Sequence, residues 1–94
     1  MKTVWLVGIS DCEGNSVLHI CSTKKLAEKK LFQERDKLVK GWTEFNIRYQ
    51  KEYPEHKDDM YERMSEGLKG NDYEKWDNFP HDCPYIYEQE VLEE

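Results

Sequence analysis

The apolar positions between Ser22 and Trp42 recur at the spacing of an amphipathic helix. At 100° per residue one side of such a helix carries Ala27, Leu31, Phe32, Leu38, Val39 and Trp42. Ser22 or Thr23 is suited to cap the first turn, and Gly41 is suited to end the helix in a left-handed conformation. The pattern therefore predicts a helix over 22–42 that covers an apolar surface.

Shorter apolar runs before this helix alternate as β-strands do. The run from Thr3 to Ile9 is apolar on both alternating sets, which is typical of a central strand. A polar loop over 11–15 separates it from a second run, Val17 to Cys21, so that the two predict a β-hairpin. We expect Leu18 and Ile20 to face the helix, because the other set of side chains includes the polar His19.

The pattern is ambiguous after Gly41. Aromatic residues over 42–53 fit helical spacing, but part of the same segment also alternates as a strand would, and helix is favoured. Pro54 is suited to a first helical position, and a second helix ending at Gly70 is predicted from an apolar stripe of Met60, Tyr61, Met64 and Leu68.

Two aromatic segments follow. Tyr73, Trp76 and Phe79 predict a short helical turn, closed by Pro80, that plugs one end of the core. The run from Pro84 to Leu92 predicts a last strand that pairs beside the first. Together these elements predict an α+β fold of the form ββα(αα)β. The three-stranded sheet should have the order second-first-third, with the main helix on one face and a helical elaboration before the last strand.

The composition narrows the class of protein. With 94 residues, 37% hydrophobic and 36% charged, the chain suits one domain over 1–94 with a thin core. Three cysteines without CxxC spacing predict free thiols in a reducing cytoplasm, and no apolar run has the length of a membrane span. We therefore expect a cytoplasmic protein without a membrane partner.

The charge is divided unevenly along the chain. Residues 1–42 hold eight basic and five acidic side chains, whereas residues 43–94 hold six basic and fifteen acidic ones. The overall charge of −6 disfavours general binding to nucleic acid and favours a basic partner surface.

Three groups of side chains are candidate binding surfaces. The leading candidate is the acidic face of the second predicted helix, with Asp58, Asp59, Glu62 and Glu66. The aromatic turn of Tyr73, Trp76 and Phe79 is the second choice. An alternative is the basic face of the first helix, with Lys25, Lys29, Lys30, Lys37 and Lys40, which would suit phosphate or nucleic acid.

Candidate chemistry is sparse. His81, Asp82 and Cys83, with Cys12 or His19, are ligand or nucleophile types, but their spacing matches no metal motif, so no cofactor and no metal are expected. Arg35 lies within the apolar stripe, and we expect an acid such as Glu28 or one from the C-terminal half to pair with it.

Two segments carry a resemblance. The helix start Ser22-Thr23-Lys24-Lys25-Leu26-Ala27-Glu28 and the closing run Pro84-Tyr85-Ile86-Tyr87-Glu88-Gln89-Glu90-Val91 resemble a loose class of short stand-alone phage and bacterial proteins. The resemblance covers about half the chain and implies a small accessory protein that binds a host protein.

We therefore expect no enzyme but a protein that binds and modulates a host protein, for example by inhibiting a defence or nucleic-acid-processing factor, through its acidic helical surface. The alternative is a nucleic-acid-binding module that uses the lysine face, and a small enzyme is third. A second copy of the chain is a further candidate partner.

Overall fold

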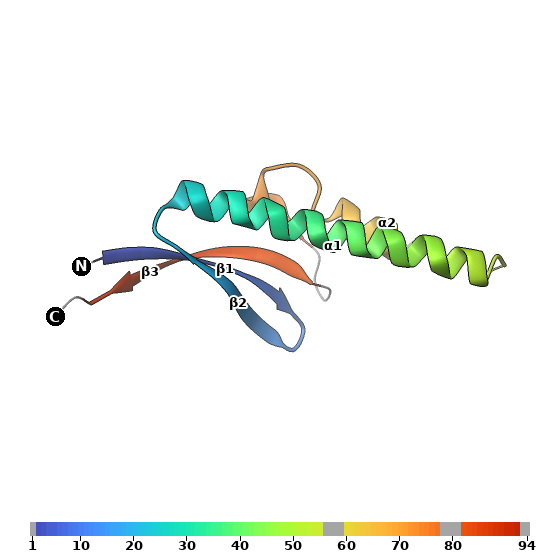
Figure 1. Cartoon of the computed structure of the whole chain (residues 1–94), viewed down its shortest axis with the longest axis horizontal. Helices are drawn as coiled ribbons and strands as arrows, with labels where there is room; N and C mark the ends of the chain where they lie inside the picture. Colours follow the sequence, from blue (N-terminus) through green and yellow to red (C-terminus); the bar gives the residue numbers. More distant parts are fainter. Residues whose placement is uncertain (1, 56–59, 78–81, 93–94) are drawn as a thin grey trace.

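The predicted α+β architecture is confirmed in a computed structural model, which describes residues 2–55, 60–77 and 82–92. A hairpin of β1 (Lys2–Asp11) and β2 (Gly14–Cys21) leads into the long helix α1 (Lys24–Glu52). The short helix α2 (Met60–Glu66) and a 3₁₀ turn, η1 (Tyr73–Lys75), precede the last strand, β3 (Cys83–Val91). Figure 1 shows the three strands as one layer, with the helical elements on one side of it.

The sheet has the predicted order β2-β1-β3, with both pairs antiparallel. The β1–β2 register shifts between Val7 and Gly8, because Val7 lies opposite His19 and Gly8 opposite Val17. The shift leaves Leu18 as the extra residue of a β-bulge. Glycine is required opposite the bulge, because a Cβ on Gly8 would meet the Ser16 carbonyl oxygen and the Tyr85 hydroxyl.

The expected orientation of β2 is wrong. Cys21 is buried against α1, whereas Ile20 is 72% exposed and Leu18 is 46% exposed on the other side. The polar member of the helix-facing set, His19, is accommodated because Glu34 on α1 lies 2.9 Å from its Nε2 atom. A polar residue thus faces the core, because the helix supplies its partner.

The helix α1 is longer than predicted. It begins as expected, with Thr23 Oγ1 accepting from the Leu26 N–H at 3.2 Å, but it continues through Gly41 to Glu52. The prediction that 43–53 is helical is confirmed for all but the cap residue Tyr53, whereas the predicted end at Gly41 is wrong. A glycine within a helix costs about 1 kcal/mol, and the apolar stripe continues past it to Trp42, Phe45 and Tyr49.

The core lies where α1 crosses the sheet. Ala27 and Leu31 of α1 pack with Val7 and Cys21 of the hairpin, and Leu68 and Trp76 close the cluster from the later part of the chain. These side chains are almost completely buried, the most exposed being Trp76 at 9%. The thin core predicted from composition is therefore built from three distant segments.

The helical elaboration is shorter than predicted. The second helix spans Met60–Glu66 rather than Pro54 to Gly70, and residues 56–59 lie outside the described residues. Met64 and Leu68 of the predicted stripe are buried, while Met60 and Tyr61 are half-buried. A turn after α2 leads to Gly70, whose φ of 80° lies in the left-handed region that glycine adopts without strain.

Arg35 ties this later segment to α1. Its Nη1 donates to the Leu68 and Gly70 carbonyl oxygens at 2.9 and 2.7 Å, and its Nη2 donates to the Asn71 side chain at 3.1 Å. The guanidinium also lies 5.1 Å from the centre of the Trp76 ring. The expected acidic partner from Glu28 or the C-terminal half is replaced by these oxygens and by the neighbouring Asp36, which accepts from Nε at 2.7 Å.

Leu31→Ala should lower the free energy of unfolding by about 2–5 kcal/mol, because it removes a fully buried side chain and leaves a cavity. The matched control is Leu26→Ala on the same helix. Because Leu26 is 41% exposed, this substitution should lower the free energy of unfolding much less. Chemical denaturation of both variants measures the difference. Equal losses would contradict this placement of α1.

Arg35→Ala should cost about 2–4 kcal/mol, because it removes charged donors from the part-buried Leu68 carbonyl oxygen and from the exposed Gly70 carbonyl oxygen. Arg48→Ala, at an exposed arginine of the same helix, should change stability by about 0.5 kcal/mol or less. Denaturation reports both values. An Arg35→Ala variant as stable as Arg48→Ala would show that the segment after α2 is held by other contacts.

Candidate protein-binding surfaces

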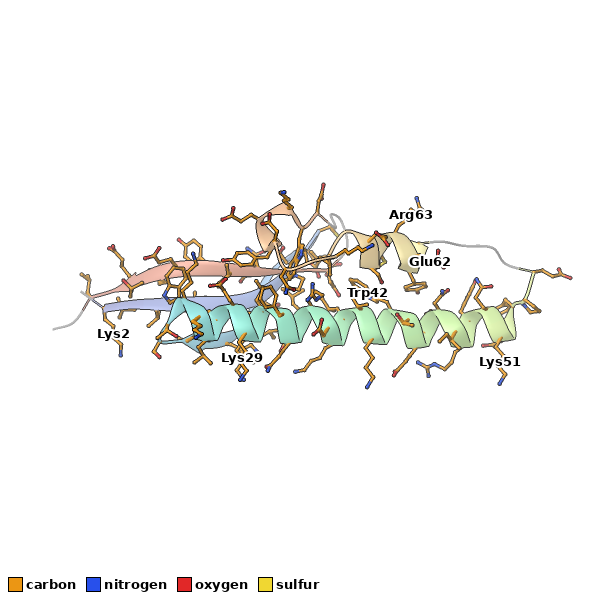
Figure 2. The ribbon with its side chains drawn as sticks, turned by 90° about the horizontal axis from the view of Figure 1, so that it is seen from above. Lys2, Lys29, Trp42, Lys51, Glu62 and Arg63 are labelled. Atoms are coloured by element: carbon orange, nitrogen blue, oxygen red, sulfur yellow. The ribbon has the colours of Figure 1, made fainter. Side chains whose placement is uncertain are left out.

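The described part of the acidic face lies on α2. Glu62 and Glu66 are both exposed, and Glu66 makes a loose contact of 3.9 Å with Lys69. Figure 2 shows Glu62 and Arg63 on α2 beside α1. Asp58 and Asp59 lie outside the described residues, so that the predicted surface is represented here by its second half.

An open groove of about 380 Å³ runs between α1 and α2. Glu62 and Glu66 line the groove on the α2 side, and α1 contributes apolar and small polar side chains on the opposite wall. The full lining is Val39, Thr43, Asn46, Ile47, Tyr61, Glu62, Ser65 and Glu66. The groove therefore has a mixed polar and apolar lining, with negative charge contributed by α2.

The distal half of α1 adjoins this groove and carries exposed apolar side chains. It projects beyond the sheet (Figure 1), and Ile47 and Phe45 on it are 63% and 46% exposed. The Phe45 ring centre lies 5.3 Å from that of Tyr61 on α2, and Tyr49 continues the aromatic row towards Tyr53. We call residues 43–53 of α1 and its cap the arm.

Sequence reasoning identified the acids but missed the arm as a surface. Its residues were assigned to helix only by their spacing, and spacing does not reveal that no strand lies beneath them. The length of the arm is the signal that could have found it. A helix of 29 residues is about 43 Å long, whereas strands of this sheet span about 30 Å.

The aromatic turn lies mainly in the core. Trp76 is buried, donates its indole N–H to the Gly70 carbonyl oxygen at 3.0 Å, and meets Phe32 edge-on at 6.1 Å between ring centres. Tyr73 is half-buried, and this burial raises the pKa of its hydroxyl, to which the charge of Glu28 adds. Phe79 lies outside the described residues. The contribution of this turn to partner binding stays a prediction.

The predicted lysine face lies on α1. Lys25, Lys29, Lys37 and Lys40 are exposed, and Lys30 is half-buried. In Figure 2, Lys29 lies on the side of α1 away from Glu62 and Arg63. Lys37 is engaged within the protein, because its Nζ lies 3.2 Å from Glu34 Oε1. Lys29 and Glu62 therefore lie on opposite sides of α1.

His19, Glu34 and Lys37 form a charged cluster between β2 and α1. The Glu34 side chain is about 10% exposed, and both His19 Nε2 and Lys37 Nζ approach the same carboxylate oxygen. The hydrogen bond from His19 holds the pKa of Glu34 below its ordinary value of 4.5, although burial alone would raise it. The cluster is a link between sheet and helix.

The candidate ligands from the sequence are not brought together in the described residues. Cys12 is exposed in the hairpin loop, Cys83 is half-buried at the start of β3, and His81 lies outside the described residues. Within 2–55, 60–77 and 82–92, no group of three or more His, Cys, Asp or Glu side chains is placed to hold a metal ion.

No family model matches the chain, and no curated protein or solved structure matches it. Across the described residues, none of the helices is both long enough and apolar enough to cross a membrane. The function is therefore argued from the fold and its surfaces.

Replacing Glu34 by Gln should make stability less dependent on pH in the acid range. Because the folded-state pKa of Glu34 is depressed, its carboxylate contributes stability above the ordinary pKa of 4.5, and this contribution is lost as the pH falls through the folded-state pKa. The stability difference between wild type and Glu34→Gln should therefore shrink on acidification. Urea denaturation of both proteins at a series of pH values measures it, with Glu44→Gln at an exposed position of the same helix as the control. A difference that is constant with pH would contradict a paired Glu34.

Proposed function

We propose that this protein is non-catalytic and acts by binding and modulating another protein, through the groove between α1 and α2 and the adjoining arm. The observation that carries the proposal is the exposed apolar surface of the arm beside the acids of α2, with Ile47 63% exposed in the same groove as Glu62 and Glu66. An exposed apolar patch with a polar rim is typical of an interaction site.

The surface area supports a protein with a partner. A compact monomer of 94 residues exposes roughly 5,800 Å², whereas this chain exposes 7121 Å². The chain therefore exposes about 1,300 Å² more than a compact monomer of this length. Part of this excess area arises because the arm extends beyond the sheet and α2 covers only one of its sides.

The chemistry of the groove indicates what would bind there. Val39 and Ile47 contribute aliphatic side chains to its lining, and Glu62 and Glu66 contribute negative charge. An amphipathic segment of a partner would place its apolar side chains against Val39 and Ile47, with a lysine or arginine facing the acids. The proposed ligand is therefore a basic amphipathic segment of a protein.

The acids act on the rate of encounter more than on the final affinity. Exposed ion pairs contribute about 0–1 kcal/mol each, but a local negative field raises association rates with a basic partner and loses its effect as salt rises. Following the resemblance of the helix start and the closing strand, we propose a host protein as the partner and inhibition as the outcome.

Charge reversal on α2 should slow partner binding without unfolding the protein. Tagged wild type would be used to capture proteins from a host lysate, and the association rate with the identified partner would then be measured. Glu62→Lys with Glu66→Lys should slow association about tenfold at low salt, with the difference shrinking as salt rises. Ile47→Ser should mainly accelerate dissociation, because it removes apolar contact from the bound state.

The matched control reverses two exposed acids away from the groove, Glu13→Lys with Glu74→Lys, which changes the net charge equally. If both double variants slow association alike, only the overall charge matters and the groove is not the site. Retention of DNA or RNA instead of a protein, abolished by Lys25→Glu with Lys29→Glu, would favour the nucleic-acid alternative.

A further inference from the structure

The face of the sheet opposite α1 is apolar across its middle, with Ser10, Asn15, Gln89 and Lys2 nearer its ends. Residues directly opposite one another in an antiparallel sheet share a face, so the register assigns Ile20, Leu6 and Tyr87 to one row across this face. The next row holds Val17, Gly8 and Tyr85. We call this surface the open face, because Figure 1 shows α1, α2 and η1 on the other side of the sheet.

The open face is strongly exposed. Ile20 is 72% exposed, Tyr87 is 56% and Val17 is 50%. The bulge adds Leu18, which is 46% exposed and lies two residues from Ile20, so that it continues the same alternation. Three strands about 4.8 Å apart and about eight residues long make a surface of roughly 350–400 Å² in projection.

This face also lacks the charge that characterises the rest of the molecule. Although 36% of all residues are charged, the only charged side chain that the register assigns to it is Lys2, at one end of β1. The acids of β3, Glu88 and Glu90, lie opposite Trp5 and Thr3 and therefore belong to the helix side. A face with a single charged side chain, at one end, in a highly charged protein is the feature that needs an occupant.

We propose that the occupant is a second copy of this chain, bound face to face about a twofold axis. Two sheets stacked in this way pack about 10 Å apart, with side chains of the two inner faces interdigitating. Ile20 and Tyr87 stand at the two edges of the row, while Leu6 on the central strand is half-buried between them. Ile20 and Tyr87, which project from the edges of one copy, would pack over the less exposed centre of the other copy, at Leu6.

Charge favours a second copy over the basic partner that binds the groove. A basic partner finds no carboxylate on the open face, whereas two open faces meet without bringing acids together. In the dimer Glu62 and Glu66 of both copies lie on the outer sides, away from the interface. Each chain carries a net charge of −6, so this is the arrangement with the least mutual repulsion.

The area sets the strength of the dimer. The two faces together amount to about 700–800 Å² in projection, and side-chain relief brings the buried surface close to the 1,000 Å² that biological interfaces exceed. The dimer therefore falls at the weak end of specific association, with a dissociation constant in the micromolar range. Both grooves stay open in it, so that the dimer does not depend on the proposed function.

Analytical ultracentrifugation of the full chain over a wide concentration range tests the proposal. Wild type should shift from monomer to dimer mass as its concentration rises through the micromolar range. Ile20→Lys should raise the dissociation constant by about 100-fold or more, because the twofold axis places the unpaired charge in the interface twice. Ile47→Lys is the matched control, since Ile47 is 63% exposed on the arm, and it should leave the dissociation constant unchanged.

Thermal melting followed by circular dichroism checks that each variant is folded. Ile20→Thr keeps a β-branched residue at this position and should still weaken the dimer if the lysine variant fails to fold. A wild type that stays monomeric up to 1 mM overturns the proposal, as does a dimer broken by Ile47→Lys and not by the Ile20 variants. A monomer whose Ile20→Thr variant loses the captured protein partner would assign the open face to that partner and also overturn the dimer.

Discussion

The Arg35 guanidinium is the contact on which the closure of this fold depends. A single helix on a three-stranded sheet buries few side chains, and the core is completed only when Leu68 and Trp76 pack against α1. Their segment has no strand or long helix to hold it. Arg35 supplies the link by donating to the Leu68 and Gly70 carbonyl oxygens, and Gly70 in turn accepts from the Trp76 indole. Charged donors to backbone oxygens stabilise a segment that hydrophobic burial alone would leave loosely placed.

A second polar link joins the hairpin to the same helix. His19 and Glu34 meet between β2 and α1, and Glu34 is the residue that directly precedes Arg35 on the helix. These two contacts use polar side chains where a larger protein would use a wider apolar core. In a chain with 36% charged residues, such links give the helix one fixed position over the sheet. They also explain why so many apolar side chains remain on the surface.

The sequence predicted the parts of the fold that depend on local pattern. The run from Thr3 to Ile9 was sufficient to identify the central strand, and the turn residues were sufficient to predict the hairpin. The orientation of β2 could not be predicted, because the bulge at Leu18 and the partner of His19 depend on long-range contacts. The same limit applies to Gly41, where a local end signal is overridden by the apolar stripe that continues to Tyr49. Of the candidate site, the acids were identifiable by type, whereas the exposure of Ile47 follows only from where the sheet ends.

Gly41 lies within α1 two residues before the arm, and a glycine at this position affects how stably the arm is ordered. A free helix of a dozen residues is marginal in water, because nucleation is unfavourable. The arm avoids this cost, since the core-bound half of α1 acts as its nucleus and helix propagates outward from Trp42. Propagation beyond the sheet must pass through the residue with the weakest intrinsic preference for helix apart from proline. Fraying that begins at the end of the arm should therefore reach no further than Gly41, so that a partner that orders the arm would slow amide exchange over 43–52 and leave exchange in 24–40 unchanged.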